Sequence, residues 1–276
     1  MNYTFVPGSI YRMPRHFGPL MGPRQGPDGR TFDCVNNPKT TTLSISFRTN
    51  PEQLEALLPD CYELVGEPIV TVHSSHMKEV EWLAGRGYAM LGVSFPAKFQ
   101  GKLDKVEGSF LSVIWENLCD PIITGREELS FAKVFSDISD PVIDGDKAST
   151  VASWQGFEFL EMQLSNLKEN AEPGSQQNDK GHDGLLHYKY IPKTGDWGQS
   201  DVEYPVLSPA SGSNTRILKN LNGDGVLKWH KARWEDLPTL YNIVNTLAEL
   251  DVLEYTQASL AYTVGSDSLR GQRILT

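Results

Sequence analysis

The stretch DPIITGREELSFAKV, residues 120–134, places one lysine, Lys133, inside an apolar run and shortly after an Arg–Glu pair. The Asp-Pro pair at its start is typical of a helix cap and first turn, and Gly125 is typical of a helix end. Lys133 is therefore expected to follow a short helix. The open question is whether its amine reaches solvent or is buried among the apolar side chains around it.

The two possibilities have different chemical consequences. A lysine at the edge of a strand can bury its stem and still extend its ammonium group into water. A lysine that is fully buried loses the hydration of the ammonium form, which lowers its pKa and leaves free amine at neutral pH. Such an amine can form a Schiff base. The resulting iminium can accept the electrons released by decarboxylation or stabilise the enamine of an aldol reaction.

Composition limits the class of protein. The chain has 276 residues, 39% of them hydrophobic and 10% aromatic, with 24 Gly and 17 Pro, which favours one β-rich domain over residues 1–276. Residues 1–38 are rich in Gly, Pro and Arg and are expected to form an extended N-terminal arm. A net charge of −10 without a basic cluster argues against nucleic acid and membrane surfaces as partners.

The cysteines and the N-terminus bear on the compartment. Cys34, Cys61 and Cys119 are odd in number and widely spaced, which favours reduced thiols and a cytoplasmic protein. The first residues lack an apolar stretch of signal-peptide length, so we expect no export signal.

Hydrophobic periodicity predicts an alternation of strands and helices. One helix should begin at Asn50 with Pro51 in its first turn, and another should run from about Asp236 to Leu250. Residues 165–183 and 193–214 are polar and rich in turn formers, and they are expected to form surface excursions. Strands are predicted at residues 41–48, 68–75, 88–95, 109–116, 185–191 and 253–264.

The segment around Lys133 resembles the active-site stretch of the acetoacetate decarboxylase superfamily, in which Gly-Arg-Glu and five further residues precede the Schiff-base lysine. FRTNPEQLEALLP at residues 47–59 and WEDLP at residues 234–238 are also similar to this family, and the resemblance covers roughly residues 38–276. It implies an α+β fold: a mainly antiparallel, barrel-like or cone-shaped sheet around a central cavity, with a few helices. It also implies a homo-oligomer that needs no cofactor, with Lys133 as the Schiff-base lysine.

The sequence departs from the family pattern at four positions. Decarboxylases of the family carry a second lysine directly after the nucleophile, where this chain has Val134. By the family's spacing, Met90 replaces an active-site glutamate, Thr40 replaces an arginine, and His73 replaces a further acidic residue. These changes keep the amine and remove groups that would handle a small β-keto carboxylate. They favour a chemistry other than acetoacetate decarboxylation.

Several other residues are candidates for the site. His73 is interpreted either as a general acid or base or as a hydrogen-bonded strand residue. Strand alternation should place Trp115 and Glu116 on opposite faces, so that only one of them faces a given cavity. Arg126 with Glu127 is either a structural ion pair or an anion clamp. The candidate substrate-binding residues are Tyr88, Met90, Trp115, Glu116, Arg126 and Phe131, and Arg12, Arg15 and Arg24 of the arm are alternatives as carboxylate ligands.

Metal binding is not expected. His73 and His76 form an HxxH pattern, but residues three apart on a strand face opposite sides, and His182 and His187 lie in or beside a polar excursion. The sequence therefore predicts a Schiff-base lyase acting on a keto acid or related carbonyl compound through Lys133. Aldolase–dehydratase or cyclase chemistry in secondary metabolism is the leading interpretation. The alternatives are a β-keto acid decarboxylase and a non-catalytic small-molecule-binding relative.

Overall fold

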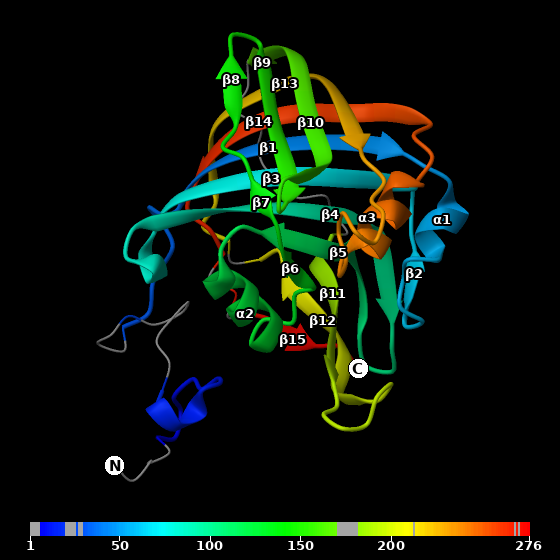
Figure 1. Ribbon diagram of the computed structural model, residues 1–276. Coiled ribbons are helices and arrows are strands. Elements are labelled where there is room, and N and C mark those ends of the chain that lie inside the picture. Colours follow the sequence, from blue (N-terminus) through cyan, green and yellow to red (C-terminus); the bar gives the residue numbers. More distant parts are fainter. Residues whose placement is uncertain are drawn as a thin grey trace.

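The computed structural model describes residues 6–19, 26, 30–169, 182–211, 213–267, 269 and 271–276 (Figure 1). None of the helices in this part of the chain is long and apolar enough to cross a membrane. The helices are η1 (Arg15–Phe17), α1 (Pro51–Glu55), η2 (Glu81–Leu83), α2 (Cys119–Glu127) and α3 (Tyr241–Ala248).

Strands dominate the described residues. In chain order they are β1 (Lys39–Arg48), β2 (Tyr62–Leu64), β3 (Ile69–Val80), β4 (Arg86–Gln100), β5 (Lys105–Glu116), β6 (Lys133–Phe135), β7 (Asp137–Ile138), β8 (Val142–Asp144), β9 (Lys147–Trp154), β10 (Phe157–Glu169), β11 (Gly184–Pro192), β12 (Ser200–Pro209), β13 (Arg216–Trp229), β14 (Glu254–Val264) and β15 (Arg273–Ile274).

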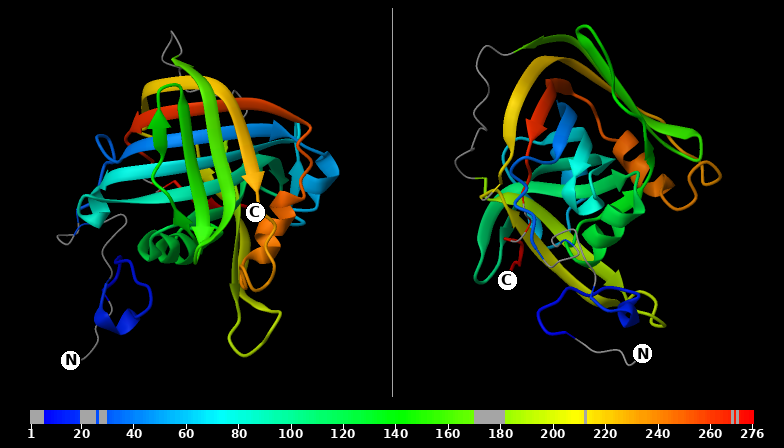
Figure 2. Two further views of the ribbon diagram at one scale, coloured as in Figure 1. Left: turned by 45° about the horizontal axis from the view of Figure 1, so that its top comes forward. Right: turned by 90° about the vertical axis from the view of Figure 1, so that its left-hand side faces the viewer.

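These strands form one strongly curved sheet that does not close on itself (Figure 2). Its order is β15-β12-β11-β5-β4-β3-β1-β14-β13-β10-β9-β7, with β2 beside β4, β6 beside β5 and β8 beside β9. All neighbouring pairs in this described sheet are antiparallel except β5 with β11 and β5 with β6. The expected α+β class, with a mainly antiparallel sheet and few helices, is confirmed.

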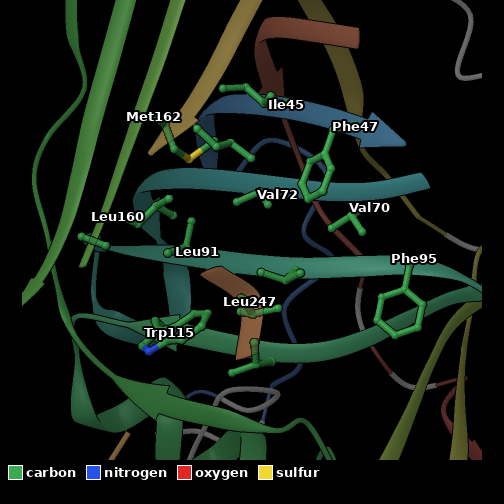
Figure 3. Close-up of a cluster of buried hydrophobic side chains, with 14 of the residues drawn as sticks. Ile45, Phe47, Val70, Val72, Leu91, Phe95, Trp115, Leu160, Met162 and Leu247 are labelled. Atoms are coloured by element: carbon green, nitrogen blue, oxygen red, sulfur yellow. The ribbon is translucent and has the colours of Figure 1, made fainter. Parts of the chain in front are cut away.

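The main core covers one face of the long central strands (Figure 3). Cross-strand pairing puts Leu43, Ser74, Leu91 and Trp115 in one row on this face, because directly paired residues point the same way. The ring of Trp115 is fully buried and lies 5.4 Å from that of Phe159 on β10. The curved sheet therefore folds β10 over the same core that β1, β3, β4 and β5 line.

Local sequence signals account for several element boundaries. Asn50 caps α1 by accepting a hydrogen bond from the backbone N–H of Glu52, and Pro51 occupies the first turn, as predicted. The strands predicted at 41–48, 68–75, 88–95, 109–116, 185–191 and 253–264 are all present, and β3, β4 and β5 extend beyond their predicted ends.

Four boundary predictions were wrong. The helix predicted over 236–250 spans only Tyr241–Ala248, because turns occupy the residues around Pro238. The excursion predicted over 193–214 contains β12, and the one over 165–183 begins as the end of β10, while residues 170–181 lie outside the described part. Polar side chains in these strands obscured the alternation of apolar and polar residues that predicts a strand. Helix α2 begins at Cys119 with Leu118 as its cap, so Asp120 lies in the first turn instead.

Candidate active site

Lys133 is the first residue of β6, and its side chain is 9% exposed. Its Nζ donates a hydrogen bond of 2.7 Å to Oε1 of Glu116 and one of 3.2 Å to the carbonyl oxygen of Pro121. The same nitrogen lies 5.4 Å from the centre of the Phe131 ring. Of the two possibilities that the apolar run leaves open, the amine is thus the buried one, and it faces a carboxylate.

Gly125 makes room for this amine. A Cβ atom at position 125 would lie 2.3 Å from Cδ, 2.5 Å from Cε and 2.8 Å from Nζ of Lys133. Helix α2 can therefore pass this close to the lysine only because residue 125 has no side chain. The glycine of the Gly-Arg-Glu motif thus has a packing role beside Lys133. The sequence had predicted Gly125 only as the end of a helix.

Glu116 is the partner that sequence spacing left unassigned. It ends β5, its side chain has no exposed surface, and its Oε2 has no hydrogen-bond partner among the described residues. Burial raises the pKa of this carboxyl, and the charge and hydrogen bond of Lys133 oppose that shift. A carboxyl in this setting can take up and release a proton close to the lysine nitrogen.

The position at which the family pattern has a glutamate lies directly beside Glu116 in the sheet. Met90, at the family's glutamate position, is the direct cross-strand partner of Glu116, and the two side chains share a face of the sheet. Directly paired residues on antiparallel strands have Cβ atoms about 5 Å apart. A carboxylate is therefore present one strand away from the position where the family pattern leads one to expect it.

His73 lies on the same face and in the same row as Lys133. The row runs from Lys133 through Ile114 and Gly92 to His73, so three strand spacings, about 14 Å, separate the two backbones. The ring rests on Gly92, where a Cβ would lie 2.5 Å from Cε1 of the imidazole. Burial lowers the pKa of His73 to about 4, so the ring is neutral at pH 7. It faces the lysine's side of the sheet without touching the lysine.

Tyr88 shares this face with Met90, since residues two apart on a strand point the same way. It is half-buried, and its ring lies 6.5 Å from that of Trp82. Burial, and to a smaller extent the negative charge of Glu116, raise the pKa of the Tyr88 phenol well above its usual value. The phenol is therefore a hydrogen-bond donor near the carboxylate at neutral pH.

Three further candidates have positions fixed by their contacts. Trp115 is not at the site: it points into the main core, on the face opposite Glu116, as alternation predicts. Arg126 donates a 2.8 Å hydrogen bond from Nη1 to the carbonyl oxygen of Lys133, and in the described residues no ion pair joins it to Glu127. Phe131 packs beside the amine and stacks on the ring of His187 at 4.5 Å.

His187 is a residue of this region that sequence reasoning missed. It is fully buried, with Nδ1 3.0 Å from the carbonyl oxygen of Ser130 and Nε2 2.8 Å from Oγ of Ser208. A carbonyl can only accept, so Nδ1 carries the proton and Nε2 accepts from the serine hydroxyl. Ser130 has a φ of 65°, which is unfavourable for a residue with a side chain. His187 thus holds the strained turn that leads into Lys133.

The arm reaches the back of α2. Arg12 donates from Nη1 to Oγ1 of Thr124, and its Nη1 lies 3.9 Å from Glu128. Arg15 lies in the exposed η1, and Arg24 lies outside the described residues. The contacts of Arg12 tie the arm to the helix that carries Gly125.

The remaining histidines point elsewhere. His76 accepts or donates a 3.0 Å hydrogen bond with Ser74 on the core side of β3, opposite the face of His73, and His182 bonds with Ser109 at 3.0 Å. Within the described ranges, no three His, Cys, Asp or Glu side chains gather as a metal site would require.

A family model described as acetoacetate decarboxylase (ADC) matches residues 12–268. No curated protein sequence matches the chain.

Solved structures share the fold at low identity. Acetoacetate decarboxylase from Legionella pneumophila superposes with a TM-score of 0.65 and 18% identity, covering 91% of this chain and 92% of that one. An acetoacetate decarboxylase-like enzyme from Sphingomonas wittichii RW1 gives 0.63 and 15%, with coverages of 89% and 94%. The enduracididine biosynthesis enzyme MppR, in complex with the condensation product of pyruvate and imidazole 4-carboxaldehyde, gives 0.61 and 17%, with coverages of 98% and 99%.

Replacing Gly125 by Ala tests the packing of the amine. The added Cβ overlaps only the flexible end of Lys133, and alanine favours a helix over glycine, so α2 should stay folded and the free energy of unfolding should fall by no more than in Lys133→Met. The displaced amine should react with carbonyl compounds at least about tenfold more slowly, as measured by borohydride trapping. Ile123→Ala, at an exposed site of the same helix, is the control. Wild-type reactivity in Gly125→Ala would contradict this packing role.

Replacing Lys133 by Met tests the buried pair. Glu116 would lose its cation, and a carboxyl whose pKa is higher in the folded than in the unfolded chain loses stability as the pH rises above about 4.3. Chemical denaturation should show a loss of about 3 kcal/mol or more at pH 8 and a much smaller loss near pH 5. Adding Glu116→Gln should remove this pH dependence. An equal loss at both pH values would rule out an ionised partner.

Proposed function

Because this chain belongs to the acetoacetate decarboxylase family, we propose that it is an enzyme that forms a Schiff base between Lys133 and a keto acid or related carbonyl compound. The observation that carries the proposal is the buried contact of 2.7 Å between Nζ of Lys133 and Oε1 of Glu116. The next step is aldol condensation with dehydration, carbon–carbon cleavage or a cyclisation, of the kind found in secondary metabolism.

The pair supplies the proton transfers that Schiff-base formation needs. Glu116 takes a proton from the ammonium group, and burial favours this transfer because it replaces two charges by two neutral groups. The free amine attacks the carbonyl carbon of the substrate, and a proton passes from the nitrogen to the former carbonyl oxygen, which gives a carbinolamine with a hydroxyl group. The protonated carboxyl then donates its proton to the departing hydroxyl, so that water leaves and an iminium forms. The iminium draws electrons from the α-carbon, which can lose a proton and become the nucleophile of an aldol reaction.

The surroundings favour carbon–carbon chemistry over acetoacetate decarboxylation. Val134 follows the lysine and faces the opposite side of β6, so no second amine stands beside the first at that position. Thr40 lies on the face of Tyr88 and carries no charge to hold a carboxylate. Met90 presents an apolar surface beside Glu116. An apolar wall with one carboxylate and a neutral His73 suits a second carbonyl compound as the electrophile.

The MppR complex supports a test of this kind, because its condensation product joins pyruvate to an aromatic aldehyde. That product is a property of MppR, and at 17% identity the likeness establishes the shared fold alone. Family membership favours a second candidate, the decarboxylation of a β-keto acid through the same iminium. We also propose that the protein works as a cytoplasmic homo-oligomer on a small carbonyl substrate, on the basis of its family and of the odd number and wide spacing of its cysteines.

Borohydride trapping tests the proposal. Incubation with pyruvate and sodium borohydride should give one reduced adduct, located at Lys133 by peptide mass spectrometry, whereas acetoacetate should release little CO2. Lys133→Ala should abolish the adduct, and Lys147→Ala, at an exposed lysine, should not. Glu116→Gln should slow adduct formation by about 10²-fold or more, since a positioned acid–base group contributes at least that much.

The other outcomes separate the alternatives. Rapid CO2 release from acetoacetate that depends on Lys133 would establish the decarboxylase. If a broad panel of aldehydes, ketones and keto acids gives no adduct, the chain is a non-catalytic binding relative.

A further inference from the structure

Strand β6 separates two environments. Lys133 faces Glu116, whereas its neighbours Ala132 and Val134 face a different cavity of about 380 Å³ between β5, β6 and α3. The size is typical of small-molecule sites in proteins, which span roughly 300–1,000 Å³. Lys133 does not line this cavity, so it is distinct from the surroundings of the amine.

The cavity has an apolar body and a charged end. Its apolar wall comes from Leu57, Val113, Val134, Ile243 and Leu247, and Arg126 stands at its edge. Arg126 and Ala132 also line an adjoining cavity of about 240 Å³, to which Lys189 contributes a second cation. Two cationic side chains, Arg126 and Lys189, thus line the second cavity in a chain whose net charge is −10.

The guanidinium is oriented for a ligand. One of its N–H groups donates the 2.8 Å hydrogen bond to the carbonyl oxygen of Lys133, which anchors this end of the side chain. A guanidinium has five N–H donors, so others remain for an anion, and its planar fork matches a carboxylate. The ammonium of Lys189 is held nearby by a 2.7 Å bond to the carbonyl oxygen of Glu127.

We propose that this cavity is a second ligand site, which binds an amphipathic monocarboxylate with its apolar body against α3 and its carboxylate on Arg126 and Lys189. The apolar lining favours a hydrocarbon body over a sugar or a nucleotide, and the paired cations favour an anion over a neutral lipid. The cavity that would hold the hydrocarbon body is not lined by Lys133, so binding there does not depend on Schiff-base chemistry.

Isothermal titration calorimetry with octanoate tests the site. The wild-type protein should bind one octanoate per chain with a dissociation constant below about 1 mM, and octanamide, which lacks the charge, should bind about tenfold or more weakly. Lys133→Met, titrated at pH 6, should bind octanoate like the wild type. A failure of borohydride trapping would leave these results unchanged, so the two proposals fail separately.

A variant that fills the cavity tests where octanoate binds. Thr246 is exposed on α3 and lines the cavity, so Thr246→Trp should block octanoate without unfolding the protein, and Thr246→Val, of similar size, should not. Circular dichroism melts confirm that both variants are folded. Equal binding to wild type and Thr246→Trp, or equal binding of octanoate and octanamide, would overturn the proposal.

Two other outcomes would also overturn it. Loss of octanoate binding in Lys133→Met alone would place the ligand at the lysine. If the wild type does not bind octanoate, and light scattering shows that Thr246→Trp changes the number of subunits, the cavity is an interface between copies of the chain.

Discussion

The buried pair of Lys133 and Glu116 is the constraint on which the rest of this region depends. Removing an ammonium and a carboxylate from water costs several kcal/mol for each ion, and only close mutual contact with further hydrogen bonds offsets that cost. Here β5 supplies the carboxylate, β6 the amine, and α2 both the carbonyl oxygen of Pro121 and the bare backbone of Gly125. Strands β5 and β6 and helix α2 must therefore all be in contact with one another at the amine. Because Oε2 of Glu116 has no partner among the described residues, the pair is held in place while keeping an acceptor for an incoming proton or ligand.

Because alternate side chains of β6 point to opposite faces, the contact of Lys133 with Glu116 and the cavity under α3 lie on different sides of the strand. The register of β5 with β6 aligns Ile114 with Lys133 and Trp115 with Val134, so every second side chain belongs to the amine's face. A slip of one residue would send the lysine toward the cavity under α3 and bring Val134 against the carboxylate. His187 on β11 opposes such a slip, since its hydrogen bond fixes the carbonyl of Ser130, three residues before the lysine. The strained backbone at Ser130 and the packing of the catalytic candidate are thus parts of one arrangement.

Sequence reasoning reached the local features of this arrangement and missed its long-range ones. The apolar run around Lys133 predicted burial, and alternation predicted that Trp115 and Glu116 point to opposite faces. The contact between Glu116 and Lys133 was not predicted, because it requires the parallel register of two strands joined by a helix, which no local period encodes. His187 was missed for the same reason, since 57 residues separate it from Ser130. Strand β12 was taken for a loop because it contains two prolines and two serines, and because its exposed residues 201–203 are consecutive and do not alternate with buried ones.

The place of the carboxylate bears on the kind of substrate that fits. A glutamate on β4, at position 90, would be displaced by one strand toward His73; here the carboxylate stands on β5, in direct contact with the amine, and Met90 covers β4. Glu116, the proton acceptor, thus contacts Nζ of Lys133. The surface that extends from Glu116 toward His73 is apolar and neutral. A substrate with a second anionic group over β4 would find no counter-charge there and would lose its hydration, which is unfavourable. An uncharged electrophile, such as an aldehyde, meets a methionine, a phenol that donates and an imidazole that is neutral at pH 7. The position of this carboxylate, one strand from the family's glutamate position, is thus one of the observations that support the proposed condensation of two carbonyl compounds.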